Sequence, residues 1–219
     1  MTAWGVIEHV AYDGQGNVSR ALSRAGLPSV TLRPFLGDEL PPVADLSGLI
    51  VLGGPSGSAD DDLPEHLPRE RCLIAGAVER RLPVLGVCFG AQLVAVALGG
   101  RVTKDGPAEL GMGSARLTPA GRSDPVLGSG DDVVDVLHWH RHGYTLPPGA
   151  VRLASSGRGV EQAFRLDENV YGVQFHVEIN DPLAGVIADQ LPDGALEPAT
   201  VTRASRWGNG VLDRFLALG

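Results

Sequence analysis

Residues 82–100 of this chain, LPVLGVCFGAQLVAVALGG, constrain its fold more than any other stretch. They begin with a short apolar run, residues 82–87, whose length and branched side chains are typical of a buried strand. They continue with residues 91–98, a helix-forming run that stops at two consecutive glycines. Cys88 lies at the junction, so the order predicts a sharp strand-to-helix turn that carries a cysteine.

Two glycines flank this cysteine, Gly86 and Gly90, and give the pattern G-x-C-x-G. It is the thiol version of G-x-S-x-G, in which the nucleophile sits on a strained turn. Side chains two residues to either side would collide with the strand and the helix. The helix N-terminus favours thiolate over thiol because its free N–H groups carry partial positive charge. We expect Cys88 to be a nucleophile; the alternative is a buried, inert cysteine.

The N-terminal half alternates between strand-like and helix-like segments. Residues 48–52 are apolar throughout, which indicates burial on both faces and hence a parallel sheet. Residues 37–46, rich in proline and aspartate, are expected to be loop. The alternation predicts a three-layer α/β fold. The expected strands are residues 4–9, 29–32, 48–52 and 82–87; the expected helices are residues 17–26, capped by Asn17 or Ser19, residues 63–81 and residues 91–98.

The pattern changes after Gly100, where strand-like segments follow one another with short turns between them. This predicts antiparallel strands added to a mostly parallel core. No repeat or linker interrupts the chain, so residues 1–219 are expected to form a single domain. The expected strands are residues 109–118, 132–137, 151–155, 160–166 and 170–176, and the expected helices are residues 182–190 and 204–218.

Charge and composition exclude several classes of function. The formal net charge is −8, and only Lys104 among the 18 basic residues is a lysine, which argues against nucleic-acid and membrane-surface partners. The first residues lack a basic segment and carry Glu8 within their apolar run, unlike a signal peptide. Two cysteines do not make a disulfide framework for a chain of this size. We therefore expect a cytoplasmic protein.

A cysteine nucleophile needs a base, and the base needs an acceptor that orients it. His176 stands at the end of an apolar strand-like run, and Glu178 follows two residues later. Side chains at positions i and i+2 of an extended chain point the same way, so Glu178 is expected to hold one imidazole nitrogen. The other nitrogen then faces Cys88. The alternative is an ordinary histidine at a strand end.

A second histidine cluster, LHWHRH, occupies residues 137–142. Histidines two positions apart can share a face and bind a metal. No cysteine or carboxylate is placed beside them to complete a ligand set, so we expect a loop that borders the site, with no metal and no cofactor.

The glycine-rich loop at residues 53–55 offers backbone N–H groups. This loop and Phe89, the residue after the cysteine, are the expected sources of oxyanion N–H groups. The loop lacks the Lys-Ser/Thr ending of a phosphate-binding P-loop, and a plain turn is the alternative.

Together these residues resemble the class I (triad) glutamine amidotransferases, and more specifically the stand-alone proteins related to the amidotransferase domain of GMP synthetase. The resemblance implies a flavodoxin-like fold, in which Cys88 attacks the side-chain amide of glutamine and forms a γ-glutamyl thioester and ammonia. It also implies that His176 acts as base and then acid, that Glu178 orients it, and that Gly54 and Phe89 supply the oxyanion N–H groups. Gln92 is implied to contact the substrate, and His140 and His142 are the other predicted substrate contacts. The segments that carry it are GGPSG at 53–57, residues 83–100, ELG at 109–111, LHWH at 137–140, LPPGA at 146–150 and YGVQFHVE at 171–178.

The chain departs from the family pattern at two places. Val177 stands where the family usually has proline, and Arg141 and His142 stand where relatives often have an acidic residue. Three functions remain open. The first is a glutaminase that passes ammonia to a separate synthase; the second is a stand-alone hydrolase or transferase of γ-glutamyl amides or hydrazides. The third is a non-catalytic regulatory or scaffolding protein.

Overall fold

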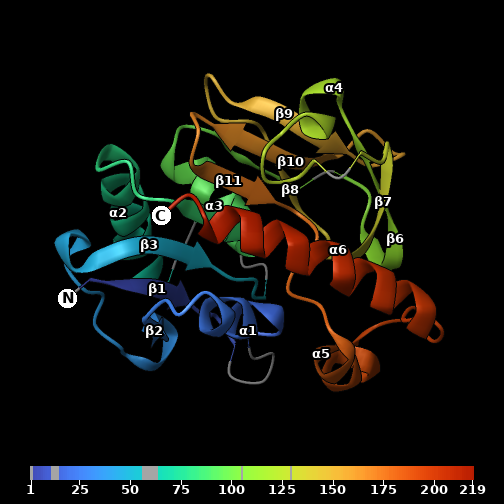
Figure 1. Ribbon diagram of the computed structural model, residues 1–219, viewed down its shortest axis with the longest axis horizontal. Coiled ribbons are helices and arrows are strands. Elements are labelled where there is room, and N and C mark those ends of the chain that lie inside the picture. Colours follow the sequence, from blue (N-terminus) through green and yellow to red (C-terminus); the bar gives the residue numbers. More distant parts are fainter. Residues whose placement is uncertain (1, 11–14, 56–63, 105, 129) are drawn as a thin grey trace.

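The computed structural model describes residues 2–10, 15–55, 64–104, 106–128 and 130–219. Its main feature is one nine-stranded sheet with the order β2-β1-β3-β4-β11-β10-β9-β6-β7 (Figure 1). Two short strands, β5 and β8, pair separately. The strands are β1 (Ala3–Ile7), β2 (Ser29–Leu32), β3 (Leu46–Val51), β4 (Val84–Val87), β5 (Val102–Thr103), β6 (Glu109–Leu117), β7 (Val133–His140), β8 (Gly143–Tyr144), β9 (Val151–Ser155), β10 (Glu161–Leu166) and β11 (Val170–Val173).

The large sheet has a parallel half and an antiparallel half that meet at β11. Strands β2, β1, β3, β4 and β11 pair in parallel, in the order typical of flavodoxin-like folds. Strands β10, β9, β6 and β7 continue the same sheet by antiparallel pairing. The predicted α/β class with an added antiparallel region is confirmed. The sheet is mixed rather than mostly parallel, because the added strands extend it instead of packing beside it.

Helices cover both faces of the sheet and make three layers, as predicted. Helices α1 and α6 pack against each other on one face, and α2 and α3 share the core of the other face (Figure 1). None of the described helices is long and apolar enough to cross a membrane. The helices are α1 (Asn17–Arg24), α2 (His66–Glu79), α3 (Phe89–Ala97), α4 (Pro119–Arg122), α5 (Asp181–Ile187) and α6 (Pro198–Leu216), with 3-10 turns at Pro34–Leu36, Val43–Asp45 and Ala188–Gln190.

Four local predictions are wrong. Neither Asn17 nor Ser19 caps α1: Gly16 holds the cap position at φ 50°, and Asn17 is already helical. The expected loop at 37–46 contains a 3-10 turn, and its last residue begins β3. β11 ends at Val173, three residues before His176. Residues 137–140 belong to β7 and not to a loop. Ser56, Gly57 and the acidic run at 60–62 lie outside the described residues.

Candidate active site

The predicted elbow is present at the carboxyl end of the parallel strands. Cys88 connects β4 to α3 with φ 54° and ψ −112°, a backbone region that non-glycine residues rarely adopt. The flanking glycines are required by space: a Cβ on Gly90 would lie 1.9 Å from the Val51 carbonyl oxygen. A Cβ on Gly86 would lie 2.6 Å from the Gly90 carbonyl oxygen. The close packing of α3 against the sheet therefore leaves room only for glycine on either side of the strained turn that carries the Cys88 thiol.

His176 and Glu178 meet as the sequence predicts, but by a different local structure. His176 Nδ1 lies 2.7 Å from the Glu178 carboxylate, and both side chains are buried. The strand has already ended, and residues 177–178 form a turn. Val177, which replaces the usual proline, is almost fully buried in the core. The turn therefore places the carboxylate against the imidazole without relying on the alternation of side chains along a strand.

The surroundings of His176 favour its protonated form. Burial alone would lower its pKa, but the charge of Glu178, followed by that of Cys88, outweighs burial and raises the pKa well above its ordinary value. The second ring nitrogen, Nε2, has no hydrogen-bond partner among the described residues. It is available for a proton exchanged with a thiol or a substrate.

The first turn of α1 holds the backbone at Glu178 by hydrogen bonds. The Asn17 backbone N–H donates to the Glu178 carbonyl oxygen at 2.8 Å, and the Asn17 side chain donates to the Ile179 carbonyl oxygen, also at 2.8 Å. A Cβ on Gly16 would lie 2.1 Å from the same Glu178 oxygen, so only glycine permits this approach. The contact fixes the backbone that carries the carboxylate.

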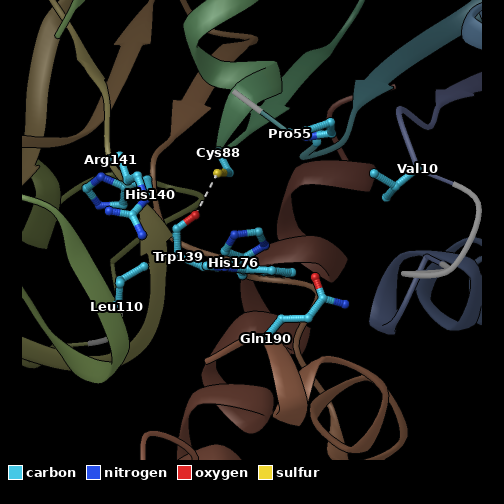
Figure 2. Close-up of a pocket in the computed structure, with 10 residues that line it drawn as sticks. Val10, Pro55, Cys88, Leu110, Trp139, His140, Arg141, His176 and Gln190 are labelled. Carbon is cyan, nitrogen blue, oxygen red and sulfur yellow. Dashed lines mark hydrogen bonds between the residues drawn. The ribbon is translucent and has the colours of Figure 1, made fainter. Parts of the chain in front are cut away.

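Cys88 and His176 line one pocket of about 240 Å³ (Figure 2). This is a small volume for a ligand site and suits a molecule of amino-acid size. The Cys88 thiol donates to the Trp139 carbonyl oxygen at 3.6 Å, the dashed line in Figure 2, and the Trp139 ring lies near His176 with centroids 6.0 Å apart. Arg141, on the turn after β7, lines the same pocket.

The glycine loop after β3 lies directly beside the nucleophile. A Cβ on Gly53 would lie 3.2 Å from His176 Cε1 and 3.5 Å from Cys88 Cβ. Gly54 lines the pocket, and Phe89 is the first residue of α3. The structure thus brings both predicted oxyanion donors close to Cys88. Their role stays a prediction.

The three predicted substrate contacts are placed differently from one another. His140 lines the pocket with Cys88. His142 lines a neighbouring cavity instead. Gln92 is buried and does not line the pocket; its amide donates to the His142 carbonyl oxygen at 3.1 Å and to the Gln174 side-chain oxygen at 3.3 Å. Gln92 therefore supports the pocket wall in this structure, and its contact with substrate stays a prediction.

A buried group behind the glycine loop was missed by sequence reasoning. His9, after β1, lies 3.0 Å from the Leu52 carbonyl oxygen and 2.8 Å from the Glu70 carboxylate. Glu70 is fully buried and also contacts His66 at 2.8 Å. A Cβ on Gly54 would lie 2.4 Å from His9 Cβ, so the group backs the loop. The position of His9 at the carboxyl end of a parallel strand was the available signal.

The expectation that no carboxylate lies beside the second histidine cluster is wrong. Glu109 on β6 stands opposite His140 on β7, and its carboxylate lies 3.3 Å from His140 Nε2 and 3.9 Å from His138 Nδ1. We call Glu109, His138 and His140 the strand cluster. Sequence proximity could not reveal the carboxylate, because pairing of β6 with β7 brings it there.

Comparisons with known proteins show which sequences and folds this chain resembles. The family model described as glutamine amidotransferase class-I matches residues 15–185. The glutamine amidotransferase-like protein YfeJ of Salmonella typhimurium is 32% identical over 176 residues, covering 78% of this chain and 74% of that protein. A subunit of the glutamine-hydrolyzing GMP synthase of Haloarcula marismortui is 37% identical over 145 residues, covering 64% of this chain and 68% of that protein.

The structural comparison covers the whole fold. A crystal structure of a glutamine amidotransferase from Methylobacillus flagellatus matches with a TM-score of 0.88 at 30% identity, covering 99% of this chain and 95% of that one. Three longer relatives are described as glutamine-hydrolyzing GMP synthases, and the chain spans 26%, 33% and 30% of their lengths.

Proposed function

The chain belongs to the class-I glutamine amidotransferase family, and from this premise we propose that it hydrolyses a γ-glutamyl amide, with glutamine as the first substrate to test. The observation that carries the proposal is the strained Cys88 elbow in one pocket with the hydrogen-bonded His176–Glu178 pair. A buried cysteine with only a packing role has no need of this arrangement. We treat residues 1–219 as one amidotransferase domain.

The proposed reaction has two steps. The Cys88 thiolate adds to the amide carbonyl carbon, and the carbonyl oxygen takes the negative charge beside the N–H groups of Gly54 and Phe89. The C–N bond then breaks while His176 gives its proton to the leaving nitrogen, which departs as ammonia. A water molecule attacks the γ-glutamyl thioester, His176 takes its proton, and glutamate leaves with the thiol restored. Glu178 keeps the imidazole oriented and its pKa raised in both steps.

We propose that the ammonia passes to a synthase on another polypeptide. The description of the Haloarcula relative as one subunit of a GMP synthase supports a separate partner of this kind. The chain spans a third or less of the length of the three longer GMP synthases.

A second substrate class is favoured by one observation. Arg141, in place of an acidic residue, lines the pocket with Cys88 and His176 (Figure 2). A cation there suits a γ-glutamyl amide or hydrazide whose other half carries negative charge. The non-catalytic alternative is disfavoured because the nucleophile, base and acceptor all lie together.

The test is release of glutamate by the purified chain from glutamine and from a panel of neutral and acidic γ-glutamyl amides. Cys88→Ser should reduce turnover by at least about 10³-fold, and mass spectrometry of the wild type should detect a γ-glutamyl adduct on Cys88. Cys72→Ser is the matched control, because Cys72 is exposed on α2 and should leave turnover unchanged. Equal turnover in Cys88→Ser and wild type would rule out the proposal.

A further inference from the structure

We propose that Glu109, His138 and His140, the strand cluster, bind a divalent transition-metal ion of the zinc class in the wall of the pocket. The three ligand atoms, Glu109 Oε2, His138 Nδ1 and His140 Nε2, all lie within 4.8 Å of one another. Two histidines and one carboxylate are a set that zinc uses with a fourth position open to water. Imidazole nitrogens disfavour magnesium and calcium, which prefer oxygen ligands.

The distances approach those of a shared ion. Ligands about 2.0–2.1 Å from a tetrahedral zinc stand roughly 3.3 Å from one another. Glu109 Oε2 lies 3.3 Å from His140 Nε2 and 3.9 Å from His138 Nδ1. An ion bound here would require the three side chains to draw closer together than they lie in this structure.

The two histidine nitrogens that face Glu109 are buried. Neither His138 Nδ1 nor His140 Nε2 has a hydrogen-bond partner among the described residues, and their side chains are only 7% and 2% exposed. A buried nitrogen without a partner is costly, and an ion between them would satisfy both.

The opposite ring nitrogens are held as metal ligands usually are. His138 Nε2 lies 3.4 Å from the Ser114 carbonyl oxygen, and the backbone of His142 hydrogen-bonds to the ring of His140. An N–H donated to a backbone carbonyl leaves the facing nitrogen unprotonated, which is the form that binds metal. Gln162 Nε2 donates to Glu109 Oε2 at 2.7 Å and orients the carboxylate.

The pKa values agree with this form. Burial, assisted by the neighbouring His138 and His176, lowers the pKa of His140 to about 3 despite the nearby His142 carbonyl. Burial also lowers the pKa of His138, although Glu109 opposes it. Both shifts favour the neutral imidazole, the form that needs no proton removed before an ion binds.

Local sequence makes room for the site. Glu109, Gly111 and Gly113 share one face of β6, opposite His140, His138 and Val136 of β7. A Cβ on Gly113 would lie 2.7 Å from the His138 ring, so glycine gives this imidazole its space. An ion here would tie β6 to β7 beside Trp139, whose carbonyl meets the Cys88 thiol.

The experiment is titration of the metal-free full chain with Co²⁺, followed by its visible absorption, and then displacement by Zn²⁺. It is performed in the Cys88→Ser background as well as in the wild type, so that the nucleophile is excluded as a ligand. One equivalent should bind in both proteins with the spectrum of a four- or five-coordinate ion. Because no turnover is measured, the result stands whether or not the proposed hydrolysis is correct.

The variants Glu109→Gln, His138→Gln and His140→Gln should each weaken Co²⁺ by more than about 100-fold, since losing even an outer partner costs about 10–100-fold. Glu168→Gln and His66→Gln are matched controls outside the strand cluster and should bind as the wild type does. Circular dichroism checks that each variant is folded. Absence of stoichiometric binding in the wild type, binding lost in Cys88→Ser, or full affinity in Glu109→Gln would each overturn the proposal and leave a metal-free hydrogen-bonded cluster.

Discussion

Two groups of histidine and carboxylate lie beside one pocket, yet the histidine pKa is shifted in opposite directions in the two groups. In the first, His176 lies 2.7 Å from Glu178 and its pKa is raised. In the second, His140 lies 3.3 Å from Glu109 and its pKa falls to about 3. A carboxylate nearby is therefore not enough to charge a histidine.

Several differences separate the two groups. Glu178 pairs with a single histidine through a 2.7 Å hydrogen bond, and Cys88 also raises the pKa of that histidine. Glu109 faces two histidines that repel each other's charge, and its oxygen already accepts from Gln162. At the second group the effect of burial on the histidine pKa therefore outweighs that of the carboxylate. At the first group the neighbouring groups outweigh burial. The same residue types thus provide a proton carrier in one place and neutral electron-pair donors in the other.

The largest expected effect separates the chemistry of the two groups. Glu178→Gln should lower turnover of the active substrate by about 10³–10⁴-fold, because His176 loses the partner that orients it. Co²⁺ affinity should not change. Glu109→Gln should have the opposite pattern. It should lower turnover far less than Glu178→Gln does, and it should remove most of the Co²⁺ affinity. Steady-state kinetics and cobalt titration of both variants check this; similar losses in both assays would show that the groups act as one.

A smaller effect is expected from the amide that holds Glu109. Gln162→Leu removes the N–H that donates to the carboxylate and leaves all three ligands in place. Co²⁺ affinity should fall by about 10–100-fold. Competition with a chelator measures it, and an unchanged affinity would show that Gln162 does not orient the site.

The smallest effect concerns the proton on His176. Burial opposes the protonated form, yet this form persists above the ordinary histidine pKa because of Glu178 first and Cys88 second. The stability that protonated His176 contributes to the fold is fully present below about pH 6.5. It is lost as pH rises through the raised pKa. Glu178→Gln should move that loss to lower pH by at least about one unit, a tenfold change in proton affinity.

Nuclear magnetic resonance of the labelled imidazole measures this midpoint directly. Cys88→Ser should move it in the same direction by a smaller amount. An identical midpoint in wild type and Glu178→Gln would contradict the assigned cause.

The sequence carried much of the fold and the centre of the site, and the physical reasons are local. Cys88 with Gly86 and Gly90 is a short motif whose strain arises within a few residues. His176 and Glu178 are two positions apart, so an extended segment or a suitable turn brings them together without pairing between distant segments. The prediction succeeded although the strand it assumed had already ended at Val173.

What the sequence could not predict depends on pairing between distant segments. Glu109 reaches His140 only through the register of β6 with β7, and the spacing of the two residues does not encode it. The His9–Glu70 contact joins residues 61 positions apart. The wrong loop at 137–140 has a related cause: the segment alone shows neither the carboxylate opposite it nor the strand β6 with which it pairs. Burial of polar side chains is decided by their partners, which a single segment does not show.

The contact of α1 with Glu178 has a consequence for when the site is completed as the chain is synthesised. Asn17 and Ile179 are joined by a hydrogen bond across 162 positions, and Asn17 holds the Glu178 carbonyl in the same way. A growing chain acquires Cys88 and its elbow well before it acquires the base and the carboxylate. We therefore expect a ribosome-bound fragment to carry a thiol without an oriented imidazole, so that Cys88, His176 and Glu178 come together only when the earliest and latest parts of the fold have met.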